Sequence, residues 1–413
     1  MRITRTPAGW IAAIALLACS PASAQTVAPP IQGATTTIPE LTVAGTLGEI
    51  AKPVGGPHIG EALALATELA IGTAPFGASS GGFLIKLDPS TGLQVRTATT
   101  FGPSFAERAL TSGEGKVSVG VNFMSVNYDR LDDSAFNGMQ TLTVASANPL
   151  QARAGVANIA ITAKTTVIAA RMGVTDKLDI GTNIPIVQVK VNGTSTLRNG
   201  TGAITTFASG TALSTGLGDI AGLAKYRFYS FGTGQPDPGG LAVMATVRLP
   251  TGSRDSLRGL GVTRTLVSFI ASSGQRRFRP HANVGFGYWS KGVTVTSDAS
   301  PNESVEARHQ FEYAGGIELE AAPKLTLLVD LLGGSVLGGG KLGFVTTTGG
   351  APGVTSTQTL TALSEGVRRV SLAPGLKVNL KGKMLLSLNA LIALHDSGLH
   401  QRVTPVAGID LTF

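Results

Sequence analysis

Two groups of polar residues have types and spacings that could do acid–base chemistry. His281 follows Arg279 by two positions and could act as a general base. No serine, histidine and acid stand in the order of a hydrolase triad, so a structural polar role is the simpler explanation. Glu318 and Glu320 could form the carboxylate pair of a glycosidase. Pairing with arginine or lysine is the commoner role of such carboxylates.

Two further patterns could bind a metal ion or a phosphate. His395 and Asp396 are adjacent, with His400 nearby, and could ligate a metal. A short loop with these residues is more often simply hydrated. The glycines at 338–340 precede Lys341 but lack the Gly-Lys-Ser/Thr signature and the following helix of a phosphate-binding loop. We therefore expect no enzyme activity, no metal and no cofactor.

These residues lie in segments that alternate apolar and polar side chains with a period of two, which is typical of half-buried β-strands. In 403–413, Ile409, Leu411 and Phe413 lie on the apolar face and Asp410 on the other. The segment resembles the closing strand of bacterial outer-membrane barrels, which the barrel-assembly machinery would recognise. An edge strand of a soluble sheet is the alternative. We expect twelve such strands, at 116–128, 156–172, 177–191, 218–229, 241–249, 263–271, 278–289, 310–321, 324–333, 367–380, 383–394 and 403–413.

The connections between the expected strands alternate between short and long. This alternation is typical of an all-β, up-and-down antiparallel barrel in the outer membrane of a Gram-negative bacterium, and a Greek-key sandwich has no reason to show it. The strand number becomes fourteen if the hairpin at 83–98 joins the wall. The short connections are 173–176, 272–275, 322–323 and 381–382. The long connections are 129–155, 192–217, 290–308 and 334–365. The connection at 230–240 departs slightly from this alternation.

The overall composition limits the possible partners. Charged residues make up only 14% of the chain, and its net charge is +8. The basic residues are scattered, which argues against nucleic-acid binding. Aromatic residues make up 5%, which is low for a barrel with complete aromatic girdles. The expected partners are outer-membrane lipid and a small-molecule solute.

The first residues resemble a secretory signal peptide. Arg2 and Arg5 precede a short apolar run at 10–18, and a small-residue motif predicts cleavage between Ala24 and Gln25. Cys19, the only cysteine, follows a lipobox-like sequence and is a candidate for acylation instead. Cleavage after Ala24 would leave no cysteine and no disulfide.

The segment 25–114 differs from the strands that follow. Its first part, to about residue 54, reads as a flexible leader, and 59–71 reads as a helix rich in alanine and leucine. The hairpin at 83–98 is too short to span a bilayer. We therefore expect three parts: a signal peptide at 1–24, an α/β leader at 25–114 that could plug the periplasmic mouth, and a barrel at 115–413.

A charge that faces lipid at mid-depth costs about 2–4 kcal/mol, so the charged residues of the strands should face the lumen. The inward charges would make the lumen wet, with acids and bases close enough to pair. The predicted lumen-lining residues are Lys164, Lys225, Arg227, Arg248, Arg279, His281, Glu312, Glu318, Asp330, Arg369, Lys377 and Asp410.

Four short motifs, in order, resemble the outer-membrane channel family named for the meta-pathway of phenol degradation, which is distantly akin to long-chain fatty-acid channels. The resemblance covers about residues 100–413 and implies a barrel that passes hydrophobic or aromatic compounds inward, without catalytic residues. A non-transporting structural or surface-binding barrel is the second hypothesis and an outer-membrane hydrolase the third. The motifs lie at 173–179 (GVTDKLD), 216–219 with 225–228 (GLGD and KYRF), 249–252 (LPTG) and 280–286 (PHANVGF).

Overall fold

The structure is a computed structural model that describes residues 42–77, 85–87, 94–96, 100–146, 148, 150, 152–231, 239–274, 277–298, 304–348, 353–380 and 383–413. The predicted signal peptide, its cleavage site at Ala24 and Gln25, and Cys19 lie outside these residues. Among the described residues, no helix is both long and apolar enough to cross a bilayer.

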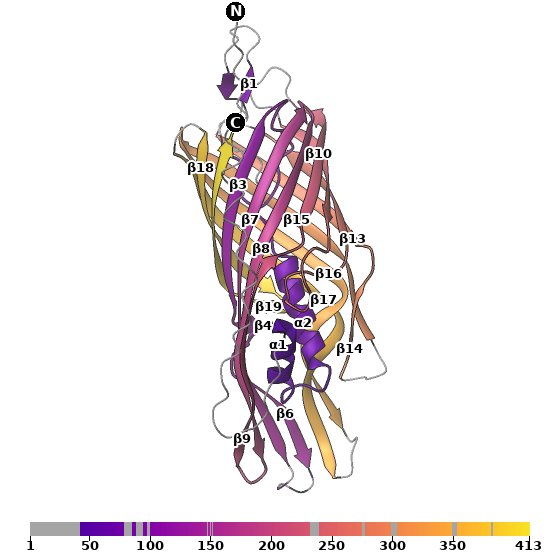
Figure 1. Ribbon diagram of the computed structural model, residues 1–413. Helices are drawn as coiled ribbons and strands as arrows, with labels where there is room; N and C mark the ends of the chain where they lie inside the picture. Colours follow the sequence, from indigo (N-terminus) through magenta and orange to yellow (C-terminus); the bar gives the residue numbers. More distant parts are fainter. Residues whose placement is uncertain are drawn as a thin grey trace, which may run out of the picture.

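Twelve antiparallel strands close into one barrel (Figure 1), which confirms the lower of the two expected strand numbers. Each strand pairs with the next, and β20 closes the ring against β3, with Ile409 opposite Val121. In order around the wall the strands are β3 (Val117–Tyr128), β7 (Arg153–Thr175), β8 (Leu178–Asn199), β10 (Ala221–Ser230), β11 (Gly240–Arg248), β12 (Arg264–Ser272), β13 (Phe278–Trp289), β15 (Ser304–Ala322), β16 (Leu325–Thr348), β17 (Val354–Asn379), β18 (Met384–Asp396) and β20 (Val403–Thr412).

The short connections gather at one end of the barrel, together with Phe413, and we call this the proximal end (top of Figure 1). The distal end differs from the expectation. The segments 192–217 and 334–365 were expected as loops, but β8, β16 and β17 run far into them, and β9 (Ile204–Leu217) pairs with β8. These segments are polar and rich in threonine, so the sequence suggested loops. A strand that does not face lipid needs no apolar outer face, and it therefore lacks the pattern by which the other strands were recognised. Further short strands are β4 (Arg130–Leu131), β5 (Ser134–Ala135), β6 (Met139–Ser146), β14 (Val293–Thr296) and β19 (Leu399–His400).

The proximal half of the wall carries an apolar outer band. Large apolar side chains there are exposed, while their neighbours along each strand are buried inside. An exposed apolar band on a closed barrel is what a surrounding bilayer requires. The band includes Val121, Phe123, Ile180, Tyr226, Phe228, Phe269, Phe286, Tyr288, Ile317, Leu327, Val329, Leu388, Ile409 and Phe413.

The distal half reverses this pattern. On β7, Ile159, Ile161 and Ala163 were expected to face lipid, but they are buried inside the barrel. Lys164 lies on the opposite face and is exposed, so its predicted lumenal position is wrong. The apolar residues point inward there because they form a core with two helices.

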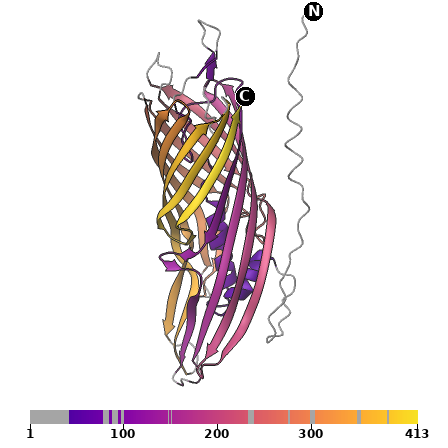
Figure 2. The same cartoon turned by 90° about the vertical axis from the view of Figure 1, so that its left-hand side faces the viewer.

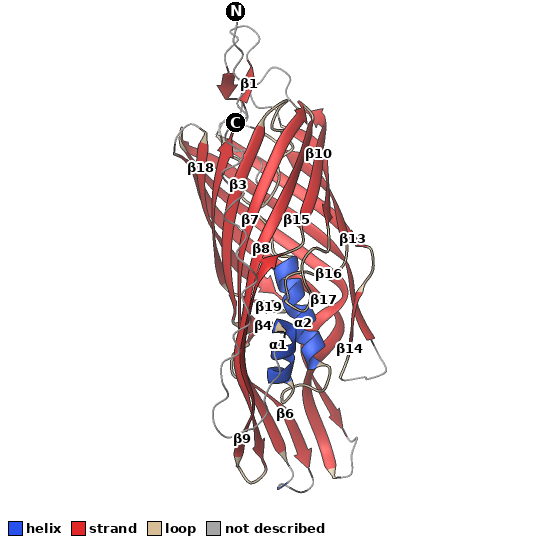
Figure 3. Cartoon of the chain, viewed as in Figure 1, coloured by secondary structure: helices blue, strands red, loops and turns tan. Residues whose placement is uncertain are grey.

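The helices α1 (Val43–Ala51) and α2 (Ile59–Gly72) lie in this distal half, between strands (Figure 3). Helix α2 confirms the expected helix at 59–71, whereas α1 corrects the flexible leader. Thr42 caps α1 by accepting the N–H of Gly45, and Val43, Leu47 and Ile50 place one apolar face against the core.

The helices also cover an interruption in the wall. In the distal half, β9 pairs only with β8, and β14 pairs only with β15, among the described strands. Helix α1 contacts β8 and β9, and α2 contacts β14, β16 and β17. Figure 2 shows the helices behind and between strands of the lower half of the wall. The two helices therefore pack where the sheet is not continuous.

The expected hairpin at 83–98 forms from β1 (Ile85–Leu87) and β2 (Gln94–Arg96). These strands pair with each other and make a separate sheet, so they do not join the wall. The hairpin projects from the proximal end (Figure 1).

Candidate functional site in the lumen

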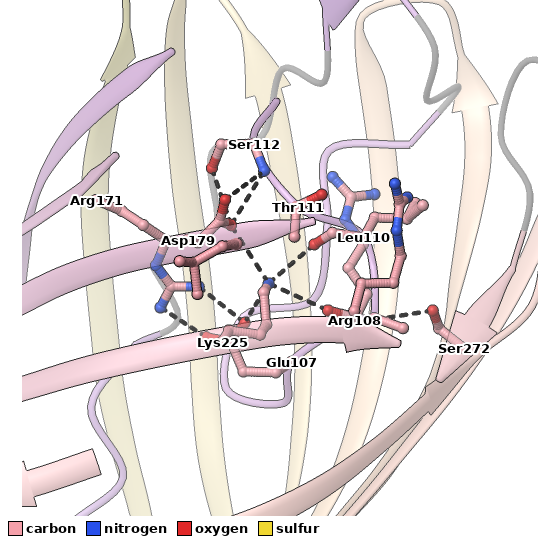
Figure 4. Close-up of polar contacts among 12 residues, drawn as sticks. Glu107, Arg108, Leu110, Thr111, Ser112, Arg171, Asp179, Lys225 and Ser272 are labelled. Carbon is pink, nitrogen blue, oxygen red and sulfur yellow. Dashed lines mark hydrogen bonds and ion pairs between the residues drawn. The ribbon is translucent and has the colours of Figure 1, made fainter. Parts of the chain in front are cut away.

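The segment 100–112 crosses the proximal half of the lumen and contacts the wall on many sides. Its backbone N–H groups donate to side chains of β8, β12, β13, β15 and β16. Asp330 alone accepts from Ser104, Phe105 and Ala106, at 3.1–3.5 Å. Asp179 accepts both the N–H and the hydroxyl of Ser112 (Figure 4). The wall's polar side chains thus satisfy backbone groups that would otherwise be buried without partners.

Glu107 is the centre of a buried ion cluster (Figure 4). The Arg171 guanidinium donates to both carboxylate oxygens, at 2.9 and 2.8 Å, and Lys225 Nζ lies 3.3 Å from Oε2. Burial alone would raise the pKa of Glu107, but the charges and hydrogen bonds of Arg171 and Lys225 lower it to about 2. Glu107 is therefore ionised at every physiological pH.

Lys225 joins the cluster to the backbone of the same segment. Its Nζ donates to the carbonyl oxygens of Arg108 and Leu110, at 3.2 and 2.9 Å. Asp179 Oδ2 lies 3.8 Å away. Lys377 acts in the same way from β17 and donates to Pro103 O at 2.7 Å. Two lysines from different strands therefore bind the carbonyl groups of one lumenal segment.

His281, the candidate general base, joins this network through one hydrogen bond. Its Nε2 lies 2.7 Å from Asp330 Oδ1, and its Nδ1 lies 3.7 Å from Glu318 Oε1. Arg108 lies 3.9 Å from Glu318 on the other side. All of these side chains are almost completely buried. In this geometry the side chains of His281 and Glu318 both contact other polar side chains of the lumen.

A second polar group surrounds the C-terminal end of α2. Arg248 and Arg264 donate to Gly72 O at 2.9 and 3.0 Å, and Arg369 donates to Thr73 Oγ1 at 2.8 Å and to Leu69 O at 3.3 Å. Carbonyl groups at a helix C-terminus carry partial negative charge, so cations stabilise it. The three arginines thus fix the end of α2 against the wall.

Between these two groups lies a cavity of about 230 Å³. Its boundary combines apolar and charged side chains from the wall with residues 73–77 of the leader. Arg248 stacks over the Phe76 ring, 4.5 Å from the centroid, at one side of the cavity. Among the lining residues are Phe76, Phe105, Leu223, Met244, Leu266, Tyr313, Leu332, Arg248, Glu312 and Arg369.

The predicted lumenal residues other than Lys164 are buried or half-buried, and many of them meet. His281, Glu318 and Asp330 form one group, and Lys225 joins the Glu107 cluster. Arg248 and Arg369 meet at the end of α2, beside the cavity that Glu312 also lines. Glu320 is half-buried. Arg227 donates to Asp176 O at 2.9 Å, near the proximal turn.

The sequence pattern did not identify five residues of the site: Glu107, Arg171, Asp179, Asp219 and Arg264. Arg171 and Lys164 lie on opposite faces of the same strand. The prediction that Lys164 faces the lumen therefore placed Arg171 on the outside. Asp219 accepts from Arg264 at 3.1 Å. Glu107 lies outside any alternating pattern, so no periodicity could have found it.

Neither the candidate metal pattern nor the candidate phosphate pattern forms such a site among the described residues. No group of three or more histidine, cysteine or acidic side chains that could hold a metal occurs in the part of the chain that the structure describes. His395 and His400 line a separate outer pocket. Lys341 pairs with Glu365 at 2.7 Å. Asp396 belongs to β18, but its side chain lies outside the described residues.

Comparison with known proteins gives distant matches. No family model and no curated protein matches the chain. Among solved structures, an outer-membrane channel from Pseudomonas putida F1 is 10% identical, with a TM-score of 0.42, and the match covers 74% of this chain and 98% of that one. The Ralstonia pickettii toluene transporter TbuX is 14% identical, with a TM-score of 0.33 and coverage of 73% and 90%. A Pseudomonas aeruginosa FadL homologue is 12% identical, with a TM-score of 0.31 and coverage of 83% and 98%. At these scores the matches assign neither a family nor a substrate.

Proposed function

We propose that the chain is an outer-membrane channel for the passive uptake of small hydrophobic or aromatic compounds, with its proximal end in the periplasm. The supporting observation is the cavity of about 230 Å³ inside a closed barrel with an apolar outer band. An apolar cavity of about 150 Å³ can bind benzene. The cavity here is large enough for one substituted aromatic ring.

The segment 100–112 is the plug in this proposal. It crosses the lumen on the proximal side of the cavity and is held by side chains from several sides of the wall. Solute passage requires this segment to move, while the wall keeps its own hydrogen bonds. The proposed plug belongs to the leader at 25–114 and lies inside the lumen, deeper than the mouth.

A matched pair of variants tests the cavity. Leu332 lines it, whereas the preceding Leu331 is exposed on the outer face. Leu332→Trp should fill the cavity and abolish binding of toluene to the purified protein, measured by calorimetry in detergent. Leu331→Trp adds the same side chain on the lipid side and should leave binding unchanged. Equal binding by both variants would contradict a solute site in this cavity.

Planar-bilayer conductance tests the channel itself. The full chain should conduct little, and deletion of residues 25–114 should raise conductance because it removes the plug. Unchanged conductance after the deletion would argue against a plug in this segment. It would also argue against a lumen that is open once the segment is removed.

The second candidate is a barrel that transports nothing, and the extensive bonding of residues 100–112 favours it. This reading predicts no conductance and no toluene entry into proteoliposomes for either form. A hydrolase remains the third candidate, and a lipid-hydrolysis assay on the purified protein would reveal it.

Export and assembly are parts of the same proposal. The mature protein should begin at Gln25, which N-terminal sequencing would show. The barrel-assembly machinery should recognise the C-terminal strand through Ile409, Leu411 and Phe413. Faster gel migration of the unboiled membrane fraction would indicate a closed, stable barrel.

A further inference from the structure

A second pocket lies on the outer side of the wall, where β18 turns back into β20. Its volume is about 230 Å³. It is predominantly polar and none of the lumenal network contributes to it. The lining residues are Arg130, Asp132, Asp133, Ala393, Leu394, His395, His400 and Arg402.

The pairing of β4 with β19 shows which way the basic residues face. Leu131 pairs with Leu399, and both are buried in the distal core. Arg130 pairs with His400 at the next position, so these two side chains share the opposite face. Neither is buried. The pocket therefore opens away from the core.

The pocket lies at the distal edge of the apolar band. On β3, the outer face changes from the exposed Phe123 to Ser125 and Asn127. Ser125 pairs with Lys164, which is also exposed, so the change to polar residues extends to β7. Leu394, with 57% of its surface exposed, forms an apolar part of the pocket's rim. A lipid whose tails cover the apolar band would place its headgroup at this level.

The pocket's charges are only partly compensated. Among the side chains that the structure describes, no carboxylate lies within ion-pair distance of Arg130 or Arg402. Asp132 Oδ1 accepts the N–H of Gly398 at 2.6 Å, and Asp133 is exposed. Counting the described side chains alone, the site thus offers two guanidinium groups without an ion-pair partner beside two carboxylates.

We propose that this pocket binds the phosphorylated headgroup of lipopolysaccharide in the outer leaflet. Guanidinium groups match phosphate geometry, and basic pockets at a membrane surface recognise anionic headgroups. The two carboxylates would repel a bare phosphate, but they suit a phosphate that carries a bridging divalent cation. This inference rests on the membrane placement in the proposed function, but not on transport.

Native mass spectrometry of the full-length protein in detergent tests the pocket. The probes are bisphosphorylated lipid A with Mg²⁺, the same lipid without its phosphates, and phosphatidylglycerol. The Arg130→Gln/Arg402→Gln variant should bind bisphosphorylated lipid A about tenfold more weakly or worse, since it loses charge-assisted hydrogen bonds. Arg198→Gln removes an exposed charge near the distal turn after β8 and should bind like the unaltered protein.

Asp133→Asn provides a second readout, because it should reduce the dependence of binding on Mg²⁺ while leaving both arginines in place. Heat-modifiable mobility of each variant would show that the barrel is folded. Equal affinity of the double-arginine variant and the unaltered protein would overturn the proposal. So would equal affinity for dephosphorylated lipid A or for phosphatidylglycerol. Failure to associate with membranes at all would instead overturn the proposed function.

Discussion

Glu107 and Arg171 face each other through two hydrogen bonds of 2.8 and 2.9 Å, although 64 positions separate them in the sequence. One residue belongs to the lumenal segment and the other to the wall. Such a pair holds the segment in place without any covalent link, so its strength should govern how easily the lumen opens.

Replacing Glu107 with glutamine should loosen this segment. Arg171 and Lys225 would keep buried charges without their carboxylate, at a cost of about 3–5 kcal/mol to the docked state. The barrel should persist, since its strand pairs do not involve Glu107. Planar-bilayer recordings should show more frequent opening. Glu114→Gln, at an exposed position of the same leader, is the control and should change nothing.

Docking of α2 should depend on pH through Glu68. Burial raises the pKa of Glu68 to about 7, and Arg254, 3.1 Å away, opposes this only in part. Asp219 and Asp255 raise it further. Between about pH 4.5 and 7, Glu68 is protonated in the docked state and ionised in the undocked state. The stability of the docked state therefore falls as pH rises through this range, by up to about 3 kcal/mol.

Hydrogen exchange of the α2 amides at pH 5.5 and 8 would measure this effect, and exchange should show less protection at pH 8 once intrinsic rates are corrected. Glu68→Gln should remove most of the difference. A difference that persists in this variant would point to another group, such as Asp298, whose pKa burial also raises.

The helix pair should tolerate no side chain at its closest contact. A Cβ atom at Gly60 would lie 2.8 Å from the Gly48 Cα atom, which is part of the backbone and cannot rotate away. Gly60→Val should destabilise the docked pair by about 1–3 kcal/mol. Limited proteolysis would detect the loosened helices. At Gly222 an added Cβ meets nothing within 4 Å, so Gly222→Val is the matched control.

Removing Phe413 should impair assembly more than stability. Phe413 exchanges two hydrogen bonds with Val117, of 2.8 and 3.3 Å, and its side chain is exposed. Loss of this one residue should lower the folded, heat-modifiable fraction in cells, while the purified chain should still refold in detergent. Normal assembly in cells would contradict a recognition role for this residue.

The wall was predictable because each strand repeats a simple pattern that a membrane imposes. The period of two put Lys225, His281 and Asp330 on the face of their strands that is buried in the structure. The position of Lys164 was predicted wrongly because the prediction assumed that apolar residues of a strand face lipid. At the level of Lys164 along the barrel, the apolar residues instead face the core that the two helices form inside. The contacts of Glu107 join a loop to distant strands, and no local spacing encodes such contacts. Helix α1 was missed because the threonine- and proline-rich residues before it suggested a flexible chain.

The outer face of β7 also works as a ruler. It is apolar at Ile168 and Met172 and polar at Thr162 and Lys164, so the change falls near Lys164, eleven positions from Thr175 at the proximal turn. At about 3.3 Å per residue and a tilt of about 40°, that distance is about 28 Å along the barrel axis. The height of an outer-membrane apolar band is about 25 Å. In the proposed outer-membrane placement, the apolar length of this one strand therefore matches the thickness of the bilayer.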